Sequence, residues 1–414
     1  MKIWIVNHYA DPPDGLATRS YDIARRLVQR GHEVTIFASN FSHYHFKPTR
    51  ELRGRPWRDE KLGGVRFIWI RTSRYKKNDS RRVLNMMSFA ALAVVRGSID
   101  RSGRPDAVVG VSVHPLAALA GWILAVARHS RFYFEVTDLW PQTLVDFGLL
   151  RDGSLTVRMM RRLETFLFRR AHRIIMLWRD TADYVEAAGG SRAKIAWVPH
   201  GVELEKYDEL PPYDGGLGRP LRIMFLGGFV SANALDVLLK GAAVLQRRGC
   251  QDVRFVLVGA GTQLQELVSL VRDLGLVNVE FLPPVPKSEV PRVMVNADAF
   301  IYGLKDLPLY RYGISLNKLT DYLAGGRPII FYGNSSYDPV ADAGAGISVP
   351  PAQPEALADA VERLAKLSPE ERQAMGRRGR QFLERHHAIS LLAERVETIL
   401  QPPPSARGRS RIQA

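Results

Sequence analysis

The sequence predicts an α/β protein built from two doubly wound units in tandem, each a parallel sheet with helices on both faces. Short apolar runs typical of buried strands alternate with longer amphipathic segments, and this alternation favours parallel sheets. The alternation stops once, in the Pro-, Gly- and acid-rich segment 205–219, and then restarts. The 414 residues are also too many for one hydrophobic core. We therefore expect one domain over 1–205 and a second over 206–385.

The first domain is expected to open with a buried strand over 2–7 and a helix over 16–30, which ends at Gly31. The same two patterns then recur along the domain. Further strands are expected at 33–39, 65–71, 107–111, 131–136 and 173–177, and further helices at 81–100, 114–127 and 155–171.

The second domain repeats this organisation, and its terminal segment 401–414, rich in Pro, Ser and Arg, is expected to be a disordered basic tail. Strands are expected at 221–226, 253–258, 279–282, 299–302, 328–332 and 347–349. Helices are expected at 234–248, 263–274, 315–324, 354–367, 369–385 and 390–400.

The net charge of +16 is concentrated in the first half, where residues 1–210 hold 34 Lys and Arg against 22 Asp and Glu. This surplus indicates an anionic partner, such as a phosphorylated substrate, an anionic lipid surface or nucleic acid, or else a solubilising surface. Contents of 46% hydrophobic and 24% charged residues exclude disorder of the whole chain. The single cysteine, Cys250, excludes a disulfide framework and suits the cytoplasm.

The longest apolar runs, 83–95 and 116–127, are shorter than the roughly 20 residues that cross a bilayer. Segments 80–97 and 157–173 mix arginine with Met, Leu and Phe. They are either helices that lie in a membrane interface or ordinary domain-covering helices with solvated arginines. The sequence therefore predicts a cytoplasmic protein, with peripheral contact to the inner face of the membrane as one alternative.

Ligands of open α/β sheets bind beyond the carboxyl ends of the strands, so the loops there hold the candidate residues. Gly15 stands just before the first helix, where it permits close backbone approach of a phosphate or is part of a plain turn. His114 follows a strand and opens a helix, where an imidazole can bind an acceptor hydroxyl or a phosphate. A lone histidine of this kind is more often structural.

The loop EVTDLWPQT follows the expected strand 131–136 and carries Glu135, Asp138 and Trp140. A carboxylate there can orient or deprotonate a hydroxyl, and the indole can pack on a sugar or a lipid. The alternative is that Asp138 caps a turn and Trp140 fills the core.

The segment YRYGISLNKLTDYLAGGRPII gives the strongest signal. Ser315 is expected to cap a helix whose positive end faces the cleft, with Asn317 and Lys318 in the first turn. Lys318 adds a charge for phosphate. Asp321 lies four residues after Asn317 on the same face, where a carboxylate suits a ribose diol.

No motif of a dedicated metal site, such as DxD, HExxH or CxxC, is present in the sequence. A nicotinamide-dependent dehydrogenase is disfavoured because GAGTQ lacks the third glycine of the dinucleotide fingerprint. A basic nucleic-acid-binding protein remains a rival, although no helix-turn-helix, zinc finger or RNP-like pattern is evident.

Several motifs, in order, resemble family 4 glycosyltransferases of the GT-B fold, in which two Rossmann-like domains face a central cleft. They are the opening IVNHYADPPDGLATRS, VPHGVELEKY, FVLVGAGTQLQEL and YGISLNKLTDYLAGGRP. Together with EVTDLWPQ, the last resembles the subgroup of L-fucosamine transferases of O-antigen, capsule and exopolysaccharide assembly.

This resemblance implies a retaining hexosyltransferase that needs no metal or other cofactor. The N-terminal domain would bind a lipid-linked or saccharide acceptor, and the C-terminal domain a nucleotide-sugar donor, with a UDP-sugar expected. The final helix, 386–400, would cross back to the first domain.

The resemblance also assigns residues. Asp321 matches the second acid of the E-x7-E motif, which holds the ribose hydroxyls, and Lys318 faces the diphosphate. Val285 follows the loop that holds the base, and Gly15 matches a glycine near the phosphates. Apart from the resemblance, the positions of Asp138 and His114 lead us to expect that one of them orients the incoming hydroxyl, with Glu135 and Trp140 on the acceptor side.

The sequence departs from the family pattern at three positions. Gly313 replaces the first glutamate of E-x7-E, and Gly228 and Asn233 stand where many members have Arg and Lys for the diphosphate. The missing charges must come from elsewhere, with Arg311, Lys318 and Arg327 as candidates. A sugar-nucleotide epimerase of the same fold is the nearest rival, and Gly313 keeps a non-catalytic, lectin-like role open as an alternative.

Overall fold

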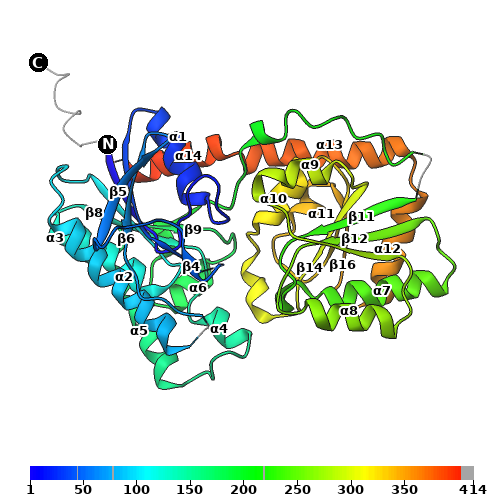
Figure 1. The fold of residues 1–414 in the computed structure, drawn as a ribbon, viewed down its shortest axis with the longest axis horizontal. Coiled ribbons are helices and arrows are strands. Elements are labelled where there is room, and N and C mark those ends of the chain that lie inside the picture. The colour runs from blue at the N-terminus through cyan, green and yellow to red at the C-terminus, as the bar shows by residue number, and fades with distance from the viewer. Residues whose placement is uncertain (44, 77–78, 218–219, 402–414) are drawn as a thin grey trace, which may run out of the picture.

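A computed structural model describes residues 1–43, 45–76, 79–217 and 220–401. Two α/β domains lie side by side, and a pair of C-terminal helices runs along one edge of both (Figure 1). The expected basic tail falls almost entirely outside the described residues.

The first domain is built on an eight-stranded sheet in the order β10-β9-β8-β7-β1-β2-β6-β5. All neighbouring strands are parallel except β5 and β6. The strands are β1 (Lys2–Val6), β2 (Glu33–Ser39), β5 (Trp57–Leu62), β6 (Val65–Ile70), β7 (Ala107–Val111), β8 (Arg131–Val136), β9 (Arg173–Met176) and β10 (Ile195–Trp197), with a separate hairpin of β3 (Phe41–Ser42) and β4 (Lys47–Pro48).

Helices cover both faces of this sheet. On one face lie α1 (Arg19–Gln29) and α14 (Ile389–Leu400), and on the other α2 (Ser80–Ser98), α3 (Pro115–Ala127) and α5 (Leu155–Arg170). The shorter α4 (Gln142–Asp146) and α6 (Ala182–Ala187) follow β8 and β9. A Cβ on Gly121 would lie 2.8 Å from the Cα of Gly110, so these two glycines let α3 pack closely on β7.

The second domain has a six-stranded, fully parallel sheet in the order β13-β12-β11-β14-β15-β16. Its strands are β11 (Leu221–Leu226), β12 (Val253–Val258), β13 (Val279–Leu282), β14 (Ala299–Gly303), β15 (Ile329–Tyr332) and β16 (Gly346–Val349). Its helices are α7 (Leu235–Arg247), α8 (Leu264–Asp273), α9 (Val290–Met294), α10 (Asn317–Ala324), α11 (Pro339–Ala343), α12 (Pro354–Lys366) and α13 (Pro369–His386).

The chain returns to the first domain at its C-terminal end. Helix α13 packs on α10 in the second domain, and α14 packs on α1 in the first. Leu392 and Val396 of α14 join the core above the first sheet, and Tyr133 of β8 donates a hydrogen bond to the carbonyl of Leu400. The first domain is therefore completed by the last helix of the chain.

Several expected elements differ from those observed. Helix α1 begins at Arg19 rather than at 16, and α10 begins at Asn317 rather than at 315. Strand β5 was not expected, because WRDEKL has no apolar run and pairs only along one antiparallel edge. The short β10 was also missed.

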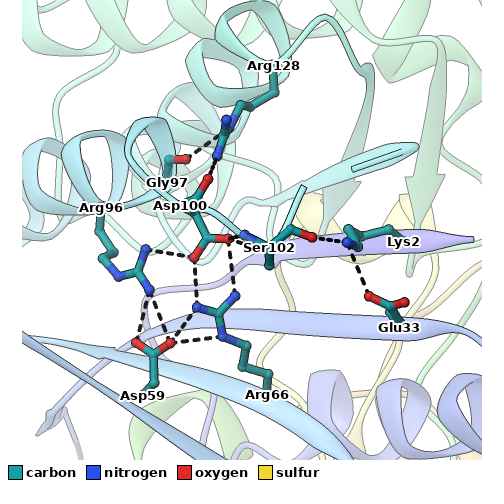
Figure 2. A network of polar contacts seen from close by, with 9 residues as sticks. All are labelled: Lys2, Glu33, Asp59, Arg66, Arg96, Gly97, Asp100, Ser102 and Arg128. Carbon is teal, nitrogen blue, oxygen red and sulfur yellow. Dashed lines mark hydrogen bonds and ion pairs between the residues drawn. The ribbon is translucent and has the colours of Figure 1, made fainter. Parts of the chain in front are cut away.

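The amino ends of β1 and β2 lie beside a network of arginines and carboxylates (Figure 2). The buried Asp100, just after α2, accepts hydrogen bonds from Arg66 and Arg96, with nitrogen–oxygen distances of 2.7 Å. Arg128 of the loop after α3 donates to the backbone carbonyls of Gly97 and Asp100. This network ties α2 and the loop after α3 to the sheet at the end opposite to the carboxyl ends of the strands.

Candidate active site

Lys318 lies in the first turn of α10 and reaches the glycine turn that follows β11. Its Nζ donates to Oδ1 of Asn233 at 2.5 Å and lies 4.8 Å from the centre of the Phe225 ring. A Cβ on Gly227 would stand 3.7 Å from the same nitrogen. Burial lowers the pKa of Lys318 to about 7. A half-buried ammonium whose hydrogen-bond partner is a neutral amide rather than a carboxylate suits an anionic ligand.

Asn233, which stands where many family members have a lysine, holds the side chain of Lys318 in place. Asn233 is buried, donates through Nδ2 to the carbonyl of Gly228 at 2.6 Å, and accepts from Lys318. The amide thus holds the glycine turn and the ammonium together. The sequence identified both residues, but their contact spans 85 positions and has no local signal.

Asp321 lies one turn further along α10. Its Oδ1 accepts a hydrogen bond from the hydroxyl of Tyr207 at 2.7 Å, and its pKa is raised by burial, with Lys287 and Tyr207 opposing that rise. Tyr207 belongs to the segment that links the two domains and was not predicted. Asp321 therefore lies at the side of the second domain that faces this linker.

Two expectations for α10 and the segments next to it are wrong. Ser315 does not cap α10, because its hydroxyl accepts a hydrogen bond from the backbone N–H of His200 at 2.8 Å, and α10 has no side-chain cap. Arg327 is buried, and its guanidinium donates to the backbone carbonyls of Ala297, Gly325 and Val295. It cannot supply charge to a diphosphate in this structure.

The other residues expected to bind the donor differ in how exposed they are to solvent. Arg311 is exposed and stacks on Tyr312, to whose hydroxyl it donates at 2.6 Å. Asn317 and Gly228 are exposed, and Val285 is half-buried in the proline-rich loop after β13. Lys287 of this loop extends across to the Thr18 hydroxyl of the first domain, 3.5 Å away.

The first domain presents two histidines where one was expected. Nδ1 of His114 accepts the backbone N–H of Ala117 at 3.2 Å, so its proton must be on Nε2, which lies 2.7 Å from Nδ1 of His8. Burial lowers the pKa of His114 to about 3. Both its ring nitrogens are engaged within the protein, so His114 caps α3 here rather than offering a nitrogen to an acceptor.

Glu135 also differs from the expectation of an acceptor-binding residue. Its Oε1 is 2.8 Å from Nε of Arg19, and both side chains are about 10% exposed or less. Arg19 also donates to the backbone carbonyls of Val198 and Pro199. Glu135 thus anchors the first turn of α1 to β8, and Arg19 in turn connects that turn to the start of the interdomain linker. Such a pairing across 116 positions could not be predicted from the sequence.

Asp138 and Trp140 follow β8 at the carboxyl edge of the first sheet. Burial raises the pKa of Asp138 to about 6, and the Thr137 hydroxyl partly opposes that shift. A carboxyl group with this pKa changes protonation near neutral pH, as general acid–base chemistry requires. The indole N–H of Trp140 is buried and has no hydrogen-bond partner within the structure. These two residues are the best-placed candidates on the acceptor side.

Gly15 lies in a tight turn before α1, where its N–H donates to the carbonyl of Pro12 at 2.9 Å. A Cβ at this position would lie 2.2 Å from the Cβ of Asp11, so the turn needs glycine. Asp11 in turn accepts from the backbone N–H groups of Leu16 and Ala17. The carboxylate takes the place that an external anion would occupy at these two donors.

Gly313 is buried where the two domains meet. It has φ 92° and ψ −172°, a conformation that is essentially restricted to glycine. A Cβ would stand 3.3 Å from the backbone nitrogen of Arg179 in the first domain. Beside it, the N–H of Asp180 donates to the carbonyl of Tyr312 at 3.1 Å. The glutamate of the family motif does not fit this backbone.

A Gly313→Glu variant should therefore lose about 2–3 kcal/mol of stability, because the new side chain forces a glycine-only conformation at a crowded contact. Gly275→Glu is the matched control, since Gly275 also has a positive φ, 60°, but nothing lies within 4 Å of its Cβ position. It should lose only about 1 kcal/mol. Urea denaturation measures both, and equal losses would contradict the crowding argument.

Among the described residues, no group of three or more His, Cys, Asp or Glu side chains could hold a metal ion. Over the same part of the chain, no helix combines the length and apolar character that a membrane span needs.

Comparison with known families identifies the class of protein. Residues 14–201 match the family model of the glycosyl transferase 4-like domain, and residues 220–366 match that of glycosyl transferases group 1. These two regions make up most of the chain and coincide with the two parallel-sheet domains. The protein is therefore a glycosyltransferase of the GT-B fold.

Individual relatives are distant. The chain is 20% identical over 348 residues to the putative colanic acid biosynthesis glycosyl transferase WcaI of Escherichia coli (strain K12), covering 80% of this chain and 83% of WcaI. Sucrose-phosphate synthase from Thermosynechococcus elongatus superposes with a TM-score of 0.73 at 16% identity, over 96% of this chain and 98% of that one. Anabaena HepE, solved with UDP and glucose, gives 0.67 at 14% identity, over 97% and 99%. The structural matches show a shared fold.

Proposed function

We propose that this glycosyltransferase moves a hexosyl unit from a UDP-sugar to a lipid-linked or saccharide acceptor in the synthesis of a bacterial surface polysaccharide. The transfer proceeds with retention and without a metal ion. An N-acetylated amino sugar is the favoured donor unit, from the resemblance to L-fucosamine transferases. The name of WcaI, which refers to colanic acid biosynthesis, supports a role in surface polysaccharide synthesis, and the UDP bound to HepE supports a UDP-sugar donor.

The observation that carries the proposal is the half-buried ammonium of Lys318 beside the glycine turn after β11. One of its three N–H donors is used by Asn233, so the remaining donors are available for phosphate oxygens. As the bond to the sugar breaks, negative charge grows on the leaving diphosphate. A preorganised cation beside the leaving group stabilises this charge more than it stabilises the intact donor.

Asp321 is assigned to the ribose and Asp138 to the acceptor. The Asp321 carboxylate accepts from Tyr207 through Oδ1, which leaves Oδ2 for a ribose hydroxyl. The raised pKa of Asp138 favours a group that orients the incoming hydroxyl and takes up its proton. Trp140 beside it would donate its indole N–H to the acceptor sugar.

A nucleotide-binding panel tests the proposal. UDP should bind more tightly than GDP, ADP, CMP or NAD, as measured by calorimetry, and Asp321→Ala should weaken UDP binding at least tenfold, since a hydrogen bond to a charged group contributes about 1.5–3 kcal/mol. Asp273→Ala, on the exposed end of α8 in the same domain, is the control and should bind as the wild type does.

Two results would contradict the assignment. Unchanged UDP affinity in Asp321→Ala would remove the ribose contact. Turnover of a UDP-sugar in the absence of any acceptor, to an isomer rather than to a glycoside, would favour the epimerase.

A further inference from the structure

The first domain has an unusual outer helical layer. Figure 1 shows α2, α3 and α5 together on its flank, and α3 packs against both α2 and α5. Helix α3, the middle one, has the sequence PLAALAGWILAVA and carries no charged residue. Its outer residues Leu119, Trp122 and Ile123 are only half-buried, and Val126 is 57% exposed. A surface helix of this composition ordinarily has a partner.

Helix α2 continues the apolar surface. Leu84, Met87, Ala91 and Val95 follow the spacing i, i+3, i+7 and i+11, which gives one stripe along three turns. All four are exposed, whereas the stripe formed by Asn85, Phe89 and Ala93 faces the core.

Helix α5 has two faces of different chemistry. Val157, Glu164, Leu167 and Phe168 face the core. The outer face interleaves apolar side chains with arginine, and its members are Leu155, Arg158, Met159, Arg162, Phe166 and Arg169. Leu155 is 66% and Met159 is 60% exposed.

The outer charge of α5 is entirely positive. Its five arginines are all exposed, and its single acid, Glu164, is buried and accepts a hydrogen bond from the Tyr184 hydroxyl at 2.7 Å. Four of the arginines, with Thr165 and Phe166, line an open hollow of about 560 Å³. They are Arg161, Arg162, Arg169 and Arg170. All six lining residues lie on α5, so the hollow is the space between arginine side chains of one helix, and it forms a cationic surface next to exposed apolar side chains.

We propose that this layer, formed by the outer faces of α2, α3 and α5, is a docking face for an anionic lipid bilayer. The apolar side chains enter the interface, and the arginines bind lipid phosphates while their stems lie on apolar surface. Arginine alternating with Leu, Met and Phe along one helix favours a bilayer over a protein partner, since protein interfaces separate an apolar centre from a polar rim.

The direction in which α2 and α5 run determines which edge of the first sheet would lie near the lipid surface. Helices that connect parallel strands run antiparallel to them, so α2 and α5 begin at the carboxyl edge of the first sheet. Leu84, Met87, Leu155 and Met159 lie in the first turns of these helices. Docking would therefore hold the edge that carries Asp138 near the lipid surface. The docking face itself does not depend on which donor the second domain binds.

Vesicle flotation tests the docking face. The full chain should float with vesicles of phosphatidylcholine containing phosphatidylglycerol, should not float with phosphatidylcholine alone, and should be released by high salt. Leu84→Ser/Met87→Ser and Arg158→Ser/Arg162→Ser should each lower the bound fraction by about tenfold or more. UDP binding by these variants serves as a check that the chain is folded and that the donor site is intact.

Matched changes on the second domain control for hydrophobicity and charge. Val277→Ser and Arg247→Ser/Arg363→Ser alter exposed residues and should leave flotation unchanged. Three results would overturn the proposal. The first is a chain that does not float at all, and the second is a loss of binding in the control variants equal to that in the docking-face variants. The third is a change of oligomeric state alone in the docking-face variants, which would assign the face to a second copy.

Discussion

A Lys318→Met variant should lose about two orders of magnitude in affinity for a UDP-sugar. Lys318 lies beside the glycine turn after β11, and its ammonium is held there by Asn233. Removing one partner of a buried, charge-assisted contact costs about 2–5 kcal/mol, and each 1.4 kcal/mol corresponds to a factor of ten in affinity. Methionine preserves the length of the side chain, so the change removes the charge with little loss of packing. Calorimetric titration measures the effect.

The pH dependence of the same titration shows whether the lower affinity of Lys318→Met comes from the lost charge or from altered packing. In the free enzyme, burial lowers the pKa of Lys318 to about 7, and a bound diphosphate would raise it again by stabilising the ammonium. The wild type must therefore take up a proton to bind the donor above about pH 7, and its affinity should fall by up to tenfold per pH unit. Below that pH the affinity should be constant. The Lys318→Met variant should show no such slope.

Lys240→Met is the control for this experiment. Lys240 is an exposed residue of α7 that pairs with Asp236, and its loss should leave both the affinity and the pH profile unchanged. If Lys318→Met bound the donor as tightly as the wild type, the diphosphate would lie elsewhere, and Arg311 would be the next residue to examine.

The sequence predicted the two parallel sheets because their strands are short apolar runs between amphipathic helices, a local property. It failed at β5, where WRDEKL is polar and pairs on one side only. Lys318 and Asp321 could be found because they stand at the start of one helix, where spacing alone puts them on related faces. The fold was thus more predictable than any single contact in the site.

The rest of the site depends on contacts between distant segments. Ser315 has the residue type and position of a helix cap, but its hydroxyl accepts a hydrogen bond from the backbone N–H of His200 in the interdomain linker instead. In the sequence His114 is an isolated histidine. In the fold, the loop after β1 places Nδ1 of His8 2.7 Å from Nε2 of His114. Arg19 and Tyr207 were missed for the same reason, since nothing near them in the sequence marks them as partners of Glu135 and Asp321.

The largest loss of stability is expected from Asp100→Ala, because this carboxylate joins three parts of the first domain. Its side chain is 1% exposed and bonds to Arg66 of β6, Arg96 of α2 and the backbone N–H of Ser102 at 2.8 Å (Figure 2). Removing one partner of a buried ion pair leaves charges without compensation and costs about 3–5 kcal/mol. Urea denaturation followed by circular dichroism should show an earlier transition of the first domain.

At acid pH the difference in the free energy of unfolding between the wild type and Asp100→Ala should become smaller. Burial alone would raise the pKa of Asp100, but hydrogen bonds from Arg66 and Ser102 outweigh it and hold the pKa well below its ordinary value. The stabilisation is therefore complete above the unfolded-state pKa of about 3.9 and is lost as the pH falls through the lower folded-state value. Asp59→Asn is the control, because Asp59 contacts the same two arginines but is 39% exposed. It should lose less than about 1 kcal/mol, and a loss equal to that of Asp100→Ala would mean that burial does not set the strength of this network.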